Sequence, residues 1–245
     1  MRFVPFLMIL ATIGLIASCS DDETSNGTDP GKPPCAPCAV VLGPDMDNTL
    51  YENAADTSNG SGNVMMAGRD GRNRIKRGLV HFDVSMIPAG SRIDSVQVRM
   101  RTVTGGQIVN VGLHRALAAW GEGTSNANCD GILCDAPVFG APAAPGDATW
   151  FSRLWPDSSW SNPGGDFVAN ASATTVVGSL AFATYRWLTN AALVTDVQGW
   201  IDDPSTNYGW VIIGDESSVG THTWFGTREI PEAALRPEIV VHYSD

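Results

Sequence analysis

Positive charge is scarce in this sequence. The 245 residues include 15 lysines and arginines against 26 aspartates and glutamates, which gives a formal net charge of −11. A protein that binds a nucleic-acid duplex needs a basic face to displace the counterions of the phosphates. The composition therefore argues against nucleic acid as a partner, although an acidic protein can still carry a local basic surface.

The sequence also lacks the short motifs of common catalytic centres. It has no Gly-x-Ser-x-Gly elbow, no His-Glu-x-x-His zinc motif, no phosphate-binding loop and no dinucleotide fingerprint. Histidine is rare, and each one lies on or near a predicted strand: His81, His114, His222 and His242. We expect a protein that is not an enzyme. A polysaccharide-active enzyme is an alternative, because the many carboxylates are compatible with a glycoside-hydrolase pair.

One long apolar run is present, at residues 3–17. It follows Arg2, is short for a membrane span and has the length of a signal-peptide core. The run ends in Ile-Ala-Ser-Cys at residues 16–19, which resembles the bacterial lipobox. The resemblance implies that residues 1–18 are a lipoprotein signal peptide and that Cys19 is lipidated. The alternative is an ordinary signal peptide followed by an incidental cysteine.

The residues after Cys19 are polar and indicate a tether. Residues 19–44 are rich in Ser, Asp, Thr, Asn, Gly and Pro, so we predict a flexible linker there. The acidic stretch at residues 20–23 resembles the export signal of some surface lipoproteins, or it is a solvated tether. Two or more acyl chains hold a protein durably on a bilayer. We therefore expect a bacterial cell-envelope protein that is anchored to a membrane by lipid, in the outer membrane and exposed at the surface.

Cysteine is also scarce. Apart from Cys19, the chain has Cys35, Cys38, Cys129 and Cys134. An oxidising compartment makes disulfides the default. A bridge between Cys129 and Cys134 would close a short loop and stabilise it by at most about 2 kcal/mol, which leaves Cys35 for Cys38. Cross-pairing and a zinc site of all four cysteines are alternatives.

The clearest strand pattern lies in residues 69–101. Apolar residues alternate with polar ones on both sides of a turn at residues 87–91, at Val80, Phe82, Val84, Val96, Val98 and Met100. A period of two is typical of strands with one face on a core and the other in water. We therefore predict two strands and their connection in this segment.

The rest of the chain repeats short strands and turns, with 26 glycines and 15 prolines. One helix is predicted over residues 189–202, because apolar residues recur there at helical spacing. Residues 118–173 form the longest irregular region, and loops of that length are usually functional or held by cross-links. We expect residues 45–245 to form one all-β domain, an antiparallel β-sandwich that is jelly-roll-like and has one short helix.

Several motifs resemble a known family. They include RIKRGLVHFDV at 74–84 and GDATW at 146–150, with further matches at residues 87–93, 114–115, 120–123, 160–167, 196–200, 207–210, 227–229 and 236–237. Together they make residues 45–243 similar to the DNRLRE-type domain of bacterial exported proteins. This β-sandwich group is related to carbohydrate-binding modules that accompany polysaccharide lyases. The resemblance implies a sandwich fold and a surface role, but no substrate.

Four aromatic residues of the irregular region are candidates for sugar binding: Trp150, Phe151, Trp155 and Trp160. Aromatic faces are flat apolar platforms for the C–H faces of pyranose rings. The alternative is that these side chains close one end of the sandwich, because large aromatic residues are mostly buried.

Four basic residues are candidates for binding an anionic polysaccharide: Arg74, Lys76, Arg99 and Arg101. The alternative is a solvated face whose charges pair with the surplus carboxylates. Four oxygen-bearing residues are candidates for a structural calcium ion, without a twelve-residue calcium loop: Asp45, Asp47, Asn48 and Asp56.

These features predict a cell-surface lipoprotein that acts without catalysis as a binding or adhesion module, with a glycan as its ligand. The main alternative is a structural protein of the cell envelope or matrix that mediates protein contacts and binds no sugar.

Overall fold

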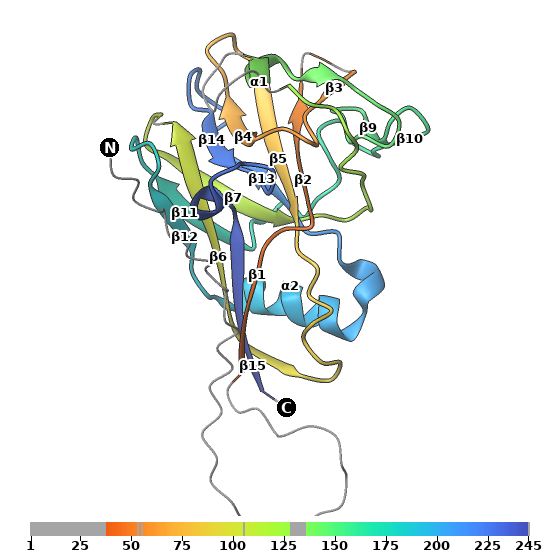
Figure 1. The fold of residues 1–245 in the computed structure, drawn as a ribbon, viewed down its shortest axis with the longest axis vertical. Coiled ribbons are helices and arrows are strands. Elements are labelled where there is room, and N and C mark those ends of the chain that lie inside the picture. Colours follow the sequence, from red (N-terminus) through yellow and green to blue (C-terminus); the bar gives the residue numbers. More distant parts are fainter. Residues whose placement is uncertain (1–37, 53, 55, 105, 128–135, 245) are drawn as a thin grey trace, which may run out of the picture. The chain divides into compact units, whose positions relative to one another are not determined.

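The structure, a computed structural model, describes residues 38–52, 54, 56–104, 106–127 and 136–244 (Figure 1). Strands make up 41% of it and helices 10%. The predicted fold class, an all-β antiparallel sandwich with one short helix, is confirmed. Cys19, Cys35, Cys129 and Cys134 lie outside the described residues, so their predicted lipidation and pairing stay predictions.

Within these residues, eleven strands form one curled sheet that folds into two layers (Figure 1). The first layer contains β1 (Cys38–Leu42), β6 (Arg92–Thr104), β12 (Thr184–Trp187) and β15 (Glu238–Ser244). The second layer contains β2 (Met46–Tyr51), β4 (Val64–Arg69), β5 (Ile75–His81), β7 (Val109–Arg115), β11 (Ala173–Val177) and β13 (Trp210–Ile213). Strand β14 (Thr223–Gly226) joins the layers, because it pairs with β6 on one side and with β4 on the other.

The strand pair predicted in residues 69–101 is present as β5 and β6. Strand β6 alternates between buried and more exposed positions along most of its length, as expected for a strand with one face on the core. Phe82 and Val84 are buried as predicted, but they lie beyond the end of β5 at His81. The two strands belong to different layers, because β6 pairs with β15 and β5 pairs with β2 and β13.

The main core lies between the two layers. Its largest fully buried side chains are Trp187, Trp200 and Trp210. Trp187 packs edge-on against Phe225 at a centroid distance of 6.0 Å, and its Nε1 donates a hydrogen bond of 2.8 Å to the carbonyl oxygen of Val111. The single side chain therefore connects β12 in the first layer to β7 in the second.

Two further clusters lie outside this core. One covers the outer face of β5 and β13 and includes Leu79, Val211, Trp150 and Trp160. The other includes Tyr51 and other side chains of β2, β4, β6 and β14. The irregular region thus forms a third layer on the second layer of the sandwich. It carries β8 (Ala141–Pro142), β9 (Ser152–Leu154), β10 (Ser158–Ser159) and the short helix α1 (Ala136–Phe139). Strand β3 (Thr57–Ser58) pairs with β8.

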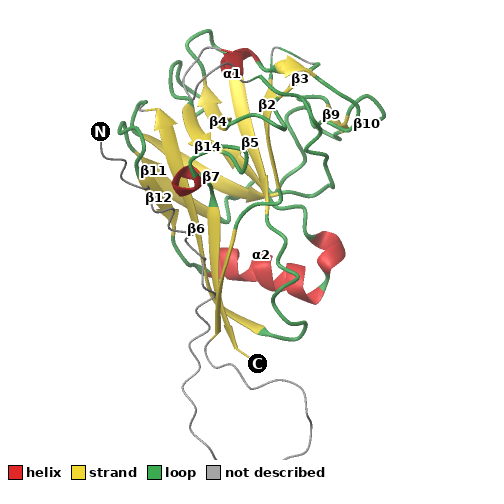
Figure 2. Cartoon of the chain, in the orientation of Figure 1, coloured by secondary structure: helices red, strands yellow, loops and turns green. Residues whose placement is uncertain are grey.

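The predicted helix is α2 (Ala191–Asp202) (Figure 2). It begins after Asn190, whose side chain accepts hydrogen bonds from the backbone N–H groups of Ala192 and Leu193. It is followed by the 3₁₀ turn η1 (Pro204–Thr206). Its apolar face adds Leu193, Val197, Trp200 and Ile201 to the main core. A second 3₁₀ turn, η2 (Ala233–Leu235), precedes β15.

The predicted boundary between linker and domain at residue 44 is wrong. Cys38–Leu42 forms β1, which pairs with β15 over five residues, from Cys38 opposite Tyr243 to Leu42 opposite Ile239. The apolar side chains of this strand reach the core, since Leu42 is buried there and Val40 packs against it. The domain therefore begins at least six residues before the predicted boundary.

We expect Trp187→Ala to lower the free energy of unfolding by about 3–5 kcal/mol, because it leaves a large cavity between the layers and removes a buried hydrogen bond. Urea denaturation followed by circular dichroism measures the change. Leu188→Ala is the matched control, because the neighbouring Leu188 side chain is 63% exposed and its loss should change stability by no more than about 0.5 kcal/mol. Equal effects of the two substitutions would contradict the packing described.

Candidate functional site

The aromatic candidates do not form an open platform. Trp150 and Trp160 are each 6% exposed and belong to the cluster that covers β5 and β13. Trp160 Nε1 donates a hydrogen bond of 2.9 Å to the carbonyl oxygen of Thr149, and the Trp150 ring lies 4.9 Å from the Arg77 guanidinium. These two tryptophans are therefore core residues. They shield the apolar outer face of β5 and β13 from water. Trp155 is half-buried, and only Phe151 is exposed.

Arg74 and Lys76, the first two basic candidates, are held by one buried carboxylate. Asp70 lies in the turn between β4 and β5, where its Oδ1 accepts hydrogen bonds from the backbone N–H groups of Arg72 and Arg74. Its Oδ2 lies 2.6 Å from Arg74 Nη2 and 3.6 Å from Lys76 Nζ. Lys76 is 1% exposed. Burial lowers the pKa of its ammonium to about 8, although the negative charge of Asp70 acts to raise that pKa. These two side chains are structural rather than available to a ligand.

The second pair of basic candidates, Arg99 and Arg101, lies in a shallow pocket on the outer face of the first layer. We call it the arginine pocket; it has a volume of about 90 Å³ and is lined by Arg99, Arg101, Thr184, Arg186, Ala234, Arg236 and Glu238. Strand register explains the convergence, because Arg99 of β6 lies opposite both Arg186 of β12 and Glu238 of β15. Four guanidinium groups therefore share one site with a single carboxylate.

Contacts within the protein neutralise little of the positive charge of the four pocket arginines. Arg99 Nη1 lies 3.3 Å from Glu238 Oε2, while the buried Arg99 Nε has no hydrogen-bond partner within the described chain. Arg236 Nε donates to the carbonyl oxygen of Ile230. Among the described residues, no hydrogen bond or ion pair involves the side chains of Arg101 or Arg186. The pocket is a local basic site on an acidic protein.

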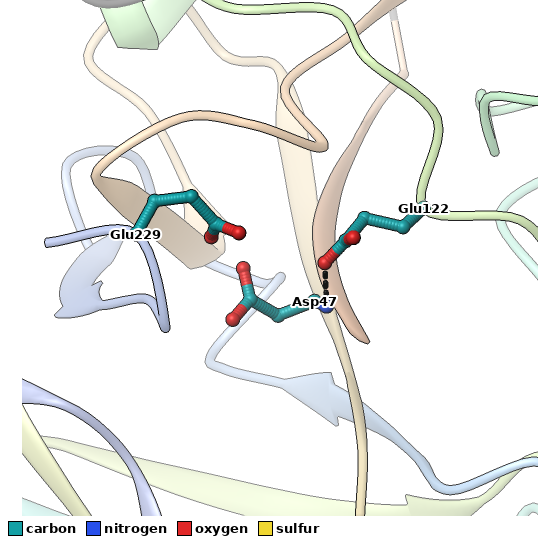
Figure 3. Close-up of side chains that lie close together, drawn as sticks. All are labelled: Asp47, Glu122 and Glu229. Atoms are coloured by element: carbon teal, nitrogen blue, oxygen red, sulfur yellow. Dashed lines mark hydrogen bonds between the residues drawn. The ribbon is translucent and has the colours of Figure 1, made fainter. Parts of the chain in front are cut away.

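A second cluster has the opposite charge. The carboxylates of Asp47, Glu122 and Glu229 lie close together, with one oxygen of each within 4.8 Å of the others (Figure 3). Asp47 comes from β2, Glu122 from the loop after β7, and Glu229 from the turn after β14. We call these residues the acidic cluster. It is the only group of this kind in the part of the chain that the structure describes.

Arg228 holds part of the acidic cluster in place. Its guanidinium makes two hydrogen bonds to Glu122, with Nε 2.8 Å from Oε1, and its Nε also lies 2.8 Å from Glu229 Oε1. Its backbone N–H donates to Asp47 Oδ2 at 2.8 Å. Burial raises the pKa of Asp47 well above its usual value, and the charges of Glu229 and Glu122 also raise it. Burial likewise raises the pKa of Glu229.

The four predicted calcium ligands do not meet. Asp47 belongs to the acidic cluster, whereas Asp45 pairs with His81 Nδ1 at 2.5 Å. Asn48 uses its side chain to hold neighbouring loops, with Nδ2 2.8 Å from Ser58 Oγ and 2.9 Å from the carbonyl oxygen of Glu122. Asp56 is exposed. The structure therefore does not bring this set together, and only Asp47 belongs to a group of carboxylates. Asp47 and Asn48 are successive residues of β2, so their side chains point to opposite faces.

A cavity lies between α2 and the connection from β5 to β6. It has a volume of about 260 Å³, and its lining includes His81, Ser85 and Trp200, whose Nε1 is buried without a hydrogen-bond partner in the described residues. A catalytic pair would need a nucleophile bonded to the His81 ring. Within the described chain, no hydroxyl or thiol group makes that bond, and Asp45 is the ring's partner.

A scan of protein-family models finds no match for the sequence, and a search of curated proteins finds no similar chain. The resemblance to the DNRLRE-type domain therefore stays a prediction. Among the described residues, no helix is long and apolar enough to cross a membrane.

Sequence reasoning found two of the four arginines of the arginine pocket and one of the three carboxylates of the acidic cluster. It selected Arg99 and Arg101 but missed Arg186 and Arg236, and it selected Asp47 but missed its two glutamate neighbours. Glu122 and Glu229 lie in segments that carried the family resemblance, which was the only available signal for them.

We expect the stability lost in Asp70→Asn to depend on pH. Burial raises the pKa of Asp70, but the hydrogen bonds from Arg74 and Arg72 and the charge of Lys76 lower it more, so the net shift is downward. A carboxylate with a lowered pKa stabilises the fold above its unfolded pKa, near 3.9, and loses that contribution as the pH falls through its folded pKa. Asp70→Asn should thus cost about 1.5–3 kcal/mol at pH 7 and much less near pH 2.

Urea titrations of both proteins across this pH range test the prediction. Asp157→Asn is the control, because Asp157 is exposed and should show no such trend. A constant difference between wild type and Asp70→Asn from pH 7 to pH 2 would rule out the charge-based account.

Proposed function

We propose that this protein is a bacterial surface lipoprotein whose sandwich binds an acidic glycan without catalysis, at the arginine pocket. The observation that supports this function is the convergence of four arginines around one glutamate on a protein of net charge −11. An uncompensated basic site on an acidic chain is expected where an anionic ligand binds.

The chemistry of the pocket favours carboxylates in a polymer. Each guanidinium is a planar fork of donors that matches a carboxylate with two parallel hydrogen bonds. Arg99 and Arg101 lie on one face of β6, about 6.8 Å apart along the strand, and Arg186 extends the row onto β12. Several forks in a row suit a chain of uronic acids better than a single small anion.

An exposed aromatic side chain lies close to the pocket in the sequence. Phe182 precedes the pocket residue Thr184 by two positions, is 51% exposed and has a φ of 58°. Its backbone N–H donates to the carbonyl oxygen of Thr102, next to Arg101, at 2.8 Å. A bulky residue with a positive φ is uncommon and frequently marks a functional position. We include Phe182 as a platform for a sugar ring, in place of the buried Trp150 and Trp160.

The alternative is a structural protein that uses the same basic surface for protein contacts. It predicts that no glycan, neutral or acidic, binds to the pocket, so one set of measurements distinguishes the two functions.

We expect a uronic-acid polymer to bind to the protein with Cys19→Ser, and a neutral polymer not to bind. Arg101→Ala and Arg186→Ala should each weaken binding by roughly 10- to 150-fold, equivalent to about 1.5–3 kcal/mol for a charged hydrogen bond. Their side chains make no internal ion pairs in the described residues, so the fold should tolerate both changes. Binding should also weaken as salt is raised.

A glycan array followed by calorimetric titration provides the measurement. Arg92→Ala is the matched control, because Arg92 lies on the same strand, is exposed and pairs with Asp94 away from the pocket. Silence across neutral and acidic glycans would favour the structural function. Binding that survives both pocket substitutions would move the site elsewhere.

The lipid anchor is tested on the processed native protein. We expect mass spectrometry to find Cys19 at the amino terminus with acyl chains attached, and we expect Cys19→Ser to leave the membrane fraction. An unmodified Cys19 in the processed protein would refute the anchor while leaving the binding function intact.

A further inference from the structure

We propose that the acidic cluster of Asp47, Glu122 and Glu229 is a binding site for one divalent cation, with Ca²⁺ as the best fit. Its residues do not line the arginine pocket, and apart from Asp47 they are not those that the sequence suggested. The inference does not depend on glycan binding.

Two orphaned oxygens carry the inference. Asp47 is fully buried, and its Oδ2 accepts the backbone N–H of Arg228, but its Oδ1 has no hydrogen-bond partner in the described chain. Glu229 Oε2 is also buried without a partner. Figure 3 shows one oxygen of Asp47 pointing toward the carboxylate of Glu229. Leaving a buried charged oxygen unsatisfied is costly, so such atoms require a ligand that is missing from the protein's own contacts.

The charge balance of the site requires positive charge. Three carboxylates face one guanidinium in direct contact, that of Arg228, which pairs with Glu122 and Glu229. The charge of Arg236 also acts on Glu229, but no ion pair joins the two side chains in the described residues. When all three carboxylates are ionised, two of their negative charges have no directly paired cation. A divalent cation would balance the excess negative charge, and it would also bind Asp47 Oδ1 and Glu229 Oε2 as ligands.

The donor atoms identify the type of cation. All three side chains offer carboxylate oxygens, which are the ligands of hard cations rather than of copper or zinc. One oxygen from each side chain lies within 4.8 Å of the others. Two oxygens that bind one Ca²⁺ at 2.3–2.6 Å can be up to about 5 Å apart, so oxygens within this bound fit Ca²⁺. Mg²⁺ demands near-ideal octahedral geometry and keeps several waters, so a buried set of carboxylates suits it less well. The arrangement is therefore compatible with Ca²⁺ without movement of the backbone.

A cation bound at the acidic cluster would have a structural role. It would connect β2, the loop after β7 and the turn after β14, three segments that are distant in sequence. Glu122 also accepts the backbone N–H of Asp47 at 2.8 Å, so two of the ligands are already fixed relative to each other. Bound Ca²⁺ would fasten the third layer to the sandwich.

A proton shared between Asp47 and Glu229 is the competing explanation, because it would satisfy the same two oxygens without a metal. The two explanations differ in whether Ca²⁺ binds to the folded protein.

The test is calorimetric titration of Ca²⁺ into the chelator-treated protein with Cys19→Ser. We expect one Ca²⁺ per chain, tighter than Mg²⁺, and a midpoint of thermal unfolding that rises by about 5–10 °C at a Ca²⁺ concentration near one hundred times Kd. Asp47→Asn and Glu229→Gln should each weaken Ca²⁺ binding at least tenfold and reduce the thermal shift.

Glu232→Gln is the matched control, because Glu232 is exposed three residues after Glu229 and makes no side-chain hydrogen bond to the turn it precedes. It should bind Ca²⁺ as the wild type does. Glu122 is not substituted, since its loss would also release Arg228. Failure of the wild type to bind Ca²⁺ would overturn the proposal in favour of a shared proton. Binding that Asp47→Asn and Glu229→Gln leave unchanged would overturn it in favour of another site.

Discussion

Burial of β5 and β13 on both faces is the constraint on which the rest of the structure depends. On one face Val80 and Ile212 enter the main core, and on the other Leu79 and Val211 are equally buried. A strand that is apolar on both sides needs a layer against each face. The first layer of the sandwich covers one face, and the irregular region from β7 to β11 has to cover the other. Trp150 and Trp160 are inside the protein for this reason.

The third layer is held by buried polar side chains rather than by regular strands. Asp147 is fully buried and accepts backbone hydrogen bonds from Thr124 through Oδ1 and from Ala144 through Oδ2. Gly123 has a φ of 72°, and a Cβ atom there would lie 1.4 Å from Asp147 Oδ1, so only glycine fits. This loop also carries Glu122. The geometry that closes the layer therefore also places one carboxylate of the acidic cluster.

The elements that could be predicted from the sequence are those whose pattern is set by neighbouring residues. The alternation in β6 and the helical spacing in α2 are properties of neighbouring residues, and both elements were predicted. Strand β1 was missed because its partner β15 lies some two hundred residues later in the chain. The exposure of the tryptophans could not be predicted, because the sequence of a loop does not reveal which surface it covers. Arg186 reaches Arg99 only through strand register, and Glu229 reaches Asp47 only through the fold.

The pairing of β1 with β15 bears on how the domain would respond to force. If the chain is tethered at Cys19, a pull on the tether reaches the described residues at Cys38, the first residue of β1. A load along the strand axis acts on the whole ladder between Cys38–Leu42 and β15 together, rather than opening one hydrogen bond at a time. Strand β15 is in turn paired with β6, the longest strand of the sheet. Under such a load the five residue pairs between β1 and β15 would share the force.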